Sequence, residues 1–406
     1  MTWTWESFMG GETRDPLIEG WYDAGTSTSG LWLQNTAACE NCSLVTSPVK
    51  NGTGAIKVGN AALNEGHVTY FTTTAPTGKL KILEGHFCLP SAPSGEFSLF
   101  YDTTTGAAEL RVGTDGRLRC ALGPAASQWS VSALPMDATT FAHVCWVIDP
   151  ITLGSAHVWN TVYINGIPEI MWDSGVEASY GASWLMTLGS HWTYLPELYV
   201  DDLCAAVSSD SNDAPHITAP PIGKMSAQHP TAAGDNDAGP PVGWTPYPNT
   251  GERYDQDWDD ATGNDGDTTY NKATTTSQKR DSHMQSADTL GWGAGAAPLH
   301  NPIYSLVHRM VSGIGSKWSA FTLCDLVTAI TLTAPGYSYG GYGRSFTRSS
   351  GSWGRDDLGT MSVGGQTSAT GMDREWRITT LLMQWLFTDS SLVKAPAPMI
   401  PQGGMF

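Results

Sequence analysis

Six aspartates lie within thirteen residues of the segment YDQDWDDATGNDGDTTYN, which runs from Tyr254 to Asn271. Carboxylates at this density are typical of calcium loops, but an EF-hand loop requires Gly at its sixth position and Glu at its twelfth. Counted from Asp255, these positions hold Asp260 and Gly266, so the motif fails. Two alternatives remain: an irregular Ca²⁺ site, or Asx turns that begin a strand and leave an acidic rim. We adopt the second and predict no metal or other cofactor.

Glu169 and Asp173 are the acids whose spacing best suits catalysis. Residues four apart on a strand share a face, and jelly-roll glycosidases use two carboxylates a few ångströms apart. The Glu-x-Asp-x-x-Glu arrangement of such hydrolases is missing, and a solvated outer face explains the pair equally well. The chain also has no HExxH and no phosphate-loop motif. The sequence therefore predicts no catalytic residue and a protein that is not an enzyme.

The segment SHWTYLPE (190–197) could bind a sugar, because pyranose faces pack on aromatic rings. Trp192 and Tyr194 are the candidate glycan-binding residues of this segment. Aromatic residues before a strand are also common as caps of a hydrophobic core, so both interpretations remain open.

The segment GYSYGGYGRSFTRSSGSWGR (336–355) mixes Tyr, Ser and Gly with Arg, which is the composition of adaptable recognition loops. A basic aromatic loop complements an acidic rim, so we expect the two to meet between subunits of a head-to-tail ring. The alternative is a mobile surface loop. The predicted interface residues are Arg344, Arg348, Arg355, Tyr339, Tyr342, Trp353, Asp255, Asp257, Asp259, Asp265 and Asp267.

The composition indicates an all-β chain that does not bind nucleic acid. The formal charge is -18, which argues against nucleic acid and against an anionic membrane surface as partners. Only 15% of residues are charged, while Gly, Pro and Trp number 45, 24 and 17, a poor composition for long helices. The first residues show no secretory signal, so synthesis in the cytosol is expected.

The seven cysteines are scattered, which argues against a disulfide framework. Cys39 and Cys42 could form half a zinc site, but no second pair at ligand spacing completes it. Cys120, Cys145 and Cys204 occupy apolar positions of predicted strands and are expected to be buried free thiols.

Residues 1–207 are expected to form one β-sandwich. Alternating patterns such as LKILEGHFCL, EFSLFYD, FAHVCWVID and ELYVDDLCAAV predict strands. The segments 108–123 and 160–172 predict hairpins that turn at Asp115-Gly116 and Asn165-Gly166. Strands at this spacing, joined by short turns, are typical of an antiparallel sandwich.

A Pro- and Gly-rich segment, 208–250, is predicted to be a linker to a second β-domain at 251–394, with an extended tail at 395–406. In the second domain, 319–335 and 374–389 predict strands. The segment 303–314 has apolar residues at helical spacing and on pattern alone favours a helix.

The first domain resembles a laminin-G or concanavalin-A-like jelly roll, through pieces such as AELRVGTDGRL, VYINGIPE and LYVDDL. The second is similar to a β-domain of tailed-bacteriophage structural proteins, through NDGDTTYN, TSQKRDS, NPIYSLVHRM and ITTLLMQWLF. In that family the NPIYSLVHRM equivalent is usually a strand, and the resemblance decides our prediction for 303–314. Together the two resemblances imply an all-β chain of two jelly-roll-like sandwiches joined by a Pro-rich linker.

The resemblance implies a non-enzymatic virion protein, a tail or fibre appendage made in the host cytoplasm. Its expected partners are further copies of itself, other virion proteins and a host-surface glycan. Two alternatives stay open: a capsid decoration or head-fibre protein, and a carbohydrate-binding or glycan-cleaving jelly-roll protein.

Overall fold

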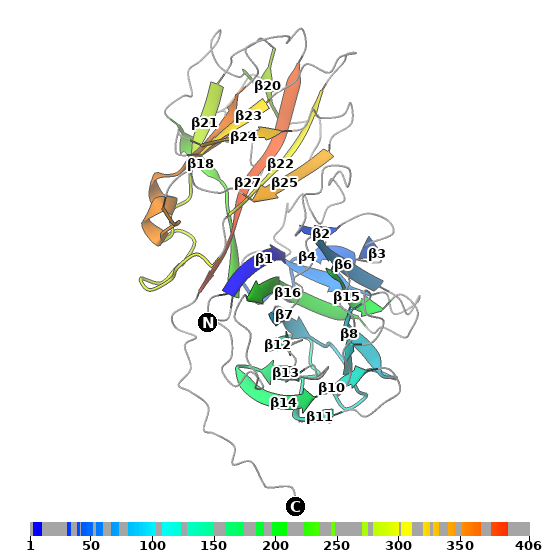
Figure 1. Cartoon of the computed structure of the whole chain (residues 1–406). Helices are drawn as coiled ribbons and strands as arrows, with labels where there is room; N and C mark the ends of the chain where they lie inside the picture. The colour runs from blue at the N-terminus through cyan, green and yellow to red at the C-terminus, as the bar shows by residue number, and fades with distance from the viewer. Residues whose placement is uncertain are drawn as a thin grey trace, which may run out of the picture.

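The computed structural model describes most of the β-structure of the chain. The described residues are 3–9, 31–33, 39–40, 42–51, 54–59, 66–72, 80–102, 108–122, 128–149, 159–173, 184–190, 197–208, 223–234, 245–247, 270–274, 279–299, 302–310, 320–324, 328–332, 340–345, 351–366 and 375–388, and for some strands the backbone alone. These residues form antiparallel sheets, two in an N-terminal unit and two in a C-terminal unit (Figure 1). The predicted fold class, an all-β chain of two sandwiches, is confirmed.

The first sheet of the N-terminal unit is built around two long strands, β7 and β16. In spatial order its strands are β14 (Ile167–Asp173), β13 (Trp159–Ile164), β12 (Ala142–Asp149), β7 (Leu80–Cys88), β16 (Leu198–Ser208), β5 (Ala55–Val58) and β4 (Cys42–Val45). β1 (Trp3–Met9) pairs with the C-terminal half of β16, on the side where β5 pairs with the N-terminal half.

The second sheet of this unit begins as a meander of four consecutive strands. Its spatial order is β11 (Gln128–Ala133), β10 (Arg117–Leu122), β9 (Ala108–Val112), β8 (Phe97–Asp102), β15 (Trp184–Ser190), β6 (Gly66–Thr72) and β2 (Leu31–Leu33), and β3 (Cys39–Glu40) also pairs with β6. The meander places β11 at the open edge of the sheet.

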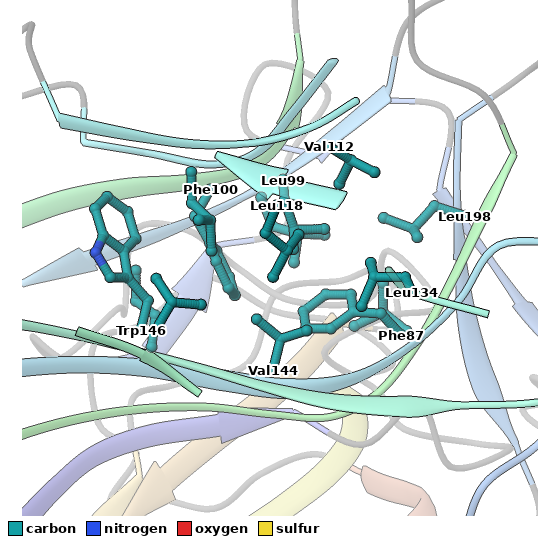
Figure 2. Packing of buried hydrophobic residues seen from close by; sticks show 14 of the residues in the cluster. Phe87, Leu99, Phe100, Val112, Leu118, Leu134, Val144, Trp146 and Leu198 are labelled. Atoms are coloured by element: carbon teal, nitrogen blue, oxygen red, sulfur yellow. The ribbon is translucent and has the colours of Figure 1, made fainter. Parts of the chain in front are cut away.

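Apolar side chains from both sheets fill the space between them. Figure 2 shows Phe87, Phe100 and Trp146 in this layer, where Phe87 meets Phe100 edge to face at a centroid distance of 5.6 Å. Burial of a large apolar side chain stabilises the fold by about 1.5–3 kcal/mol. The indole Nε1 of Trp146 donates a hydrogen bond of 3.1 Å to Asn160 Oδ1, so its polar atom is satisfied inside the unit.

Both predicted hairpins are present, with the predicted turns. Asn165 and Gly166 have φ angles of 52° and 77°, the left-handed region that a tight two-residue hairpin turn requires. In the other hairpin Leu118 pairs with Val112 and Cys120 with Leu110, so the apolar residues share the core face. The pattern of turn residues and alternation therefore specified the register.

The C-terminal unit has one sheet built on the longest strand, β27 (Trp376–Thr388). The spatial order is β19 (Thr245–Tyr247), β20 (Tyr270–Ala273), β27, β22 (Ile303–Met310) and β25 (Gly340–Ser345), and β17 (Gly223–Gln228) pairs with the C-terminal half of β27. The second sheet has the order β18 (Pro230–Ala233), β21 (Lys279–Met284), β26 (Ser362–Gln366), β23 (Ala320–Cys324) and β24 (Thr328–Leu332). A 3-10 helix, η3 (Arg355–Thr360), precedes β26.

Tryptophans dominate the core of the C-terminal unit. Trp385 meets Trp292 and Trp353 edge to face, at centroid distances of 5.9 and 5.6 Å. The indole Nε1 of Trp385 donates a hydrogen bond of 2.8 Å to Gln228, which is itself buried. Gln228 belongs to β17, so this bond fixes β17 on the unit.

The segment 303–314 is a strand where the structure describes it, as the family resemblance predicts and contrary to its helical spacing. β22 lies between β27 and β25, so it is a central strand. A central strand can be apolar on both faces, which removes the alternation that would identify it.

The predicted linker 208–250 is wrong in part, because β17, β18 and β19 lie within it and belong to the sheets of the C-terminal unit. The prolines did exclude central strands: Pro230 and Pro246 lie in β18 and β19, which are edge strands. The remainder of this segment and the predicted tail 395–406 lie outside the described residues.

The prediction of buried free thiols is confirmed for Cys120, Cys145 and Cys204, and Cys88 is a fourth such residue. Burial raises the pKa of all four, that of Cys88 to about 11. Nothing is described for the side chains of the other cysteines, including the suggested half zinc site. Across the described ranges, no helix is long and apolar enough to cross a membrane.

Candidate functional site

The outer face of the β8–β11 meander carries a cluster of arginines. Leu110, Val112 and Leu118 point into the core, so the residues between them point outward. Arg111 on β9 lies directly opposite Arg119 on β10. Like charges opposite each other on neighbouring strands are unfavourable, and both guanidinium groups therefore need acidic partners.

Glu96 and Glu109 supply those partners. Glu96 Oε1 accepts hydrogen bonds from Arg119 and, at 3.4 Å, from Nη1 of Arg111. Glu109 accepts one of 2.5 Å from Nε of Arg111. Burial alone would lower the pKa of Arg111, but the hydrogen bonds and charges of the two glutamates outweigh it and raise that pKa. The two acids therefore favour the charged form of Arg111.

A third arginine, Arg117, extends this face toward the β9–β10 turn. Its Nε donates a hydrogen bond of 2.6 Å to Oδ2 of Asp115, and this bond is the main cause of the lowered pKa of Asp115. The pair is exposed, and exposed ion pairs contribute little to stability. These side chains can therefore change partners around a ligand at small cost.

Trp129 on β11 lies beside these arginines. It is opposite Arg119 in the ladder, and the guanidinium carbons of Arg119 and Arg117 lie 5.2 and 5.5 Å from its ring centroid, within cation–π range. The ring is 36% exposed. Its far edge lies close to Gly113, where a Cβ would be only 2.7 Å from the indole. We call Trp129, Arg111, Arg117, Arg119 and their three acidic partners the Trp129 surface.

A bulge in β11 fixes the backbone next to this tryptophan. The ladder between β10 and β11 is interrupted between Arg119 and Arg117, opposite residues 130–132. Inside the bulge, Oγ of the buried Ser130 accepts a hydrogen bond of 2.8 Å from the N–H of Leu118 and donates one of 2.7 Å to the carbonyl of Ser132. These bonds replace those that the broken ladder omits.

Glu169 closes the bulge from the other sheet. Its carboxylate accepts hydrogen bonds of 3.0 Å from the N–H groups of Val131 and Ser132 and one of 2.6 Å from Ser132 Oγ. Glu169 has no partner on β13, because the ladder shifts register between its neighbours Pro168 and Ile170. Figure 1 shows β11 and β14 together at the end of the N-terminal unit.

This position gives Glu169 a structural role in place of the catalytic one considered from its spacing to Asp173. All three of its hydrogen bonds are made to β11, so the carboxylate is committed to the sheet edge. The side chain of Asp173 lies outside the described residues. The pair therefore offers no support for a glycosidase mechanism.

Two of the predicted interface residues prove to have partners within the chain. Trp353 is only 8% exposed and packs in the core against Trp385, so its ring lies inside the unit and does not form an exposed contact surface. Arg355 binds Asp288 and the carbonyls of Trp292 and Gly293, the latter two at 3.1 Å. Both residues lie in a Gly- and Ser-rich segment without an apolar pattern, so these contacts could not be inferred from the local sequence.

The other predicted site residues are not tested by the structure. Arg344 and Tyr342 lie on β25 opposite Tyr304 and Leu306, but their side chains are not described. The remaining ones fall wholly outside the described residues: Arg348, Tyr339, Asp255, Asp257, Asp259, Asp265, Asp267, Trp192 and Tyr194. For these residues the interface and glycan-binding predictions stay predictions.

The sequence was expected to hold no nucleophile-elbow motif, and this expectation is wrong. Residues 336–340, GYSYG, have the G-x-S-x-G spacing of a nucleophile elbow. That motif needs a strand before the serine and a helix after it, whereas β25 begins at Gly340. The structural context of the motif is therefore not met.

A buried polar cluster lies on the face of the first sheet that points away from the hydrophobic core between the two sheets. Nδ1 of His86 is 3.0 Å from Asp202 Oδ2, Nε2 of His143 is 3.3 Å from Glu84 Oε2, and the imidazole centroids are 5.0 Å apart. Desolvation lowers the pKa of His86. Because all four residues are buried, we assign the cluster to the structure of the unit. Among the side chains that the structure describes, no group has the arrangement of a metal site.

Sequence reasoning did not single out the Trp129 surface. The hairpin pattern over 108–123 already places Arg111, Arg117 and Arg119 on the face of the sheet that points away from the core leucines. A prediction of QWSVSA as the next strand of the meander would have placed Trp129 beside these arginines. The bulge is a tertiary feature that depends on Glu169, and no local pattern predicts it.

No protein-family model matches the chain, and a search of curated proteins finds no match. Among solved structures, the chain is similar to domain 4 of an extracellular arabinanase from Geobacillus stearothermophilus in complex with arabinotriose. That match has 12% identity and a TM-score of 0.35, and it covers 51% of this chain and 93% of the domain.

Two further solved structures are similar over less than half of this chain. The botulinum neurotoxin serotype G binding domain matches at 12% identity and a TM-score of 0.31, over 45% of this chain and 46% of that one. An endo-β-1,4-glucuronan lyase from Trichoderma reesei matches at 11% identity and 0.28, over 40% and 85%. At these TM-scores the similarities carry no argument, and function rests on the chain's own residues.

Proposed function

We propose that the chain is a glycan-binding β-sandwich protein and that the Trp129 surface is its binding site. The observation that carries the proposal is the partly exposed indole of Trp129, with the guanidinium groups of Arg117 and Arg119 within cation–π distance of its ring, on an otherwise polar sheet face. A pyranose presents a polarised C–H face that packs on an aromatic ring and a rim of hydroxyl groups. The indole suits the face of the sugar, and the surrounding charged groups suit its rim.

The balance of charges on this surface favours a neutral sugar. Arg111, Arg117 and Arg119 are matched by Glu96, Glu109 and Asp115, so the formal charges cancel. Hydroxyl groups both donate and accept hydrogen bonds, and the surface offers both kinds of partner. A polyanionic glycan would also meet the repulsion of a chain whose net charge is -18.

The rigidity of the surface supports binding over catalysis. Close approach to Gly113 restricts the indole, and Glu169 and Ser130 fix the strand that carries it. A ligand that binds a preorganised ring loses less free energy to ordering of the protein. The role we propose is recognition of a glycan, without bond cleavage.

A glycan array tests this proposal. Wild-type protein should bind a subset of neutral oligosaccharides, and Trp129→Ala should lose that signal. Met136→Ala removes another partly exposed apolar side chain of the same unit and should retain it. An array on which wild type and Trp129→Ala bind the same glycans equally would contradict the proposal.

A second proposal is the structural role in a bacteriophage virion that the sequence resemblance implies. Val131 and Ile167, 87% and 48% exposed, favour it, because strongly exposed apolar side chains are typical of surfaces that meet another protein. In this proposal the partners are other copies of the chain and other virion proteins, and the glycan belongs to the host surface.

Gold-labelled antibody against the chain tests the virion role. Labelling at one defined position on intact phage particles would support it. Absence of the chain from purified particles, as measured by mass spectrometry, would contradict the virion role and would not affect the glycan-binding proposal.

A further inference from the structure

Tyr247 occupies the edge of the larger sheet in the C-terminal unit. β19, the strand that carries it, stands at the end of the strand order and pairs with β20. In this ladder Tyr247 lies directly opposite Tyr270. Tyr270 is buried, whereas Tyr247 is 45% exposed.

The two tyrosine rings form a stack that runs across the strands. Their centroids are 4.7 Å apart and their planes differ by 15°, and 4.7 Å is about the spacing of neighbouring strands. The guanidinium of Arg377 lies 4.2 Å from the centroid of Tyr270. Arg377 belongs to β27, on the other side of β20, so the order is Arg377, Tyr270, Tyr247 and then the sheet edge. Among the described residues, the ring of Tyr247 is therefore the outermost member of this stack.

The edge itself is unsuited to a further strand. Pro246 occupies the middle of β19 and cannot donate a backbone hydrogen bond. Prolines on edge strands oppose edge-to-edge pairing. A partner that stacks on the ring meets no such obstacle.

Polar groups accompany the stack on the same face. Lys272 lies opposite Thr245 and next to Arg377 in the ladder, and its Nζ is 3.6 Å from Glu375. Glu375 also accepts a hydrogen bond of 2.5 Å from Arg377. The stack therefore combines aromatic rings with paired donors and acceptors, as the Trp129 surface does, but here the charged groups lie inward of Tyr247, on the side of β20 and β27.

We infer that Tyr247 is a second glycan-binding site, which takes a neutral pyranose stacked on the outer face of its ring. The inference rests on the proposed function, which it extends to the C-terminal unit. Two weak sites on one chain raise the affinity for long or clustered glycans through effective concentration. Short glycosides would then bind each site independently, while a polysaccharide would engage both.

Saturation-transfer NMR on the full chain separates the two sites. The probes are methyl β-D-glucopyranoside, methyl β-D-galactopyranoside and methyl α-D-mannopyranoside. The Trp129→Ala protein should still transfer saturation to the C–H protons of at least one glycoside. Adding Tyr247→Ala should weaken that residual binding at least about tenfold. Adding Tyr247→Phe keeps the ring and should leave the affinity within about twofold of the Trp129→Ala protein, and thermal unfolding verifies that each variant is folded.

The outcomes distinguish the inference from the proposed function. If Trp129→Ala abolishes all transfer, the second site is overturned and the first is retained. If Trp129→Ala leaves transfer unchanged and Tyr247→Ala in the wild-type background reduces it, the second site stands and the Trp129 proposal fails. Transfer to none of the probes in wild type, or transfer that neither substitution changes, overturns both. Loss of self-association in Tyr247→Ala, seen by sedimentation with glycoside binding unchanged, would assign the ring to a second copy of the chain and overturn the inference.

Discussion

Glu169 binds Ser132 through both the backbone N–H and the hydroxyl, at 3.0 and 2.6 Å. This link joins β14, the edge of one sheet, to β11, the edge of the other. It also supports the bulge beside Trp129. An acid that resembled half of a catalytic pair is therefore a structural support of the candidate binding surface.

Removal of the Glu169 carboxylate should destabilise the N-terminal unit. Glu169→Ala deletes the acceptor of three hydrogen bonds, and we expect a loss of about 1–2 kcal/mol in the free energy of unfolding. Glu169→Gln keeps one acceptor oxygen and should cost less. Urea unfolding measures both, with Asp356→Asn on an exposed acid as the control. Equal stability of Glu169→Ala and wild type would mean that the link contributes nothing.

Trp353→Ala should destabilise the isolated chain, because its ring fills the core of the C-terminal unit. We expect a cost of about 3–5 kcal/mol, typical of a buried aromatic residue replaced by alanine. Trp129→Ala is the matched control and should cost much less, since that ring is partly exposed. Thermal unfolding compares the two. A Trp353→Ala chain as stable as wild type would restore the interface interpretation of this residue.

The sequence predicted features that depend on neighbouring residues and missed those that depend on distant ones. Asn165 and Gly166 specify their turn locally, and alternation specified the core face of β9 and β10. β17 is short and polar, and only its pairing with β27, more than a hundred residues later, makes it a strand. Trp353 lies among glycines and serines, so its burial could not be inferred from its own segment.

Stability should fall in acid because of His86. Desolvation lowers its pKa in the folded state below the ordinary value of about 6.5, so the unfolded chain binds the proton more readily. The contribution is full above the unfolded value and is lost as the pH falls from about 6.5 toward the folded value, with a slope of at most about 1.4 kcal/mol per pH unit. Asp202, His143 and Lys50 are the titratable groups that act on it.

His86→Gln tests this assignment. Denaturant unfolding of wild type and variant should be compared between about pH 8 and about pH 5. The variant is expected to be less stable at high pH and to show a shallower decline in this window. An identical pH profile would assign the decline to other groups.

Gly113→Ala should displace the indole of Trp129. A Cβ at this position would lie 2.7 Å from the ring, closer than atoms approach without a shift of one of them. We expect weaker glycan binding, about threefold to tenfold, with a stability loss of about 1–3 kcal/mol from overpacking. Gly359→Ala, whose Cβ would meet its nearest neighbour at 4.0 Å, is the control. Unchanged affinity in Gly113→Ala would show that the position of the ring does not matter for binding.

The affinity of Trp129→Ala for the best neutral oligosaccharide from the array tests the central claim most directly. Isothermal titration should show binding by wild type and Met136→Ala, and a loss of at least about tenfold, or 1.4 kcal/mol, in Trp129→Ala. Circular dichroism and thermal unfolding should show that the variant keeps its fold. Equal affinities of the folded Trp129→Ala protein and wild type would contradict the account and remove the Trp129 surface as the binding site.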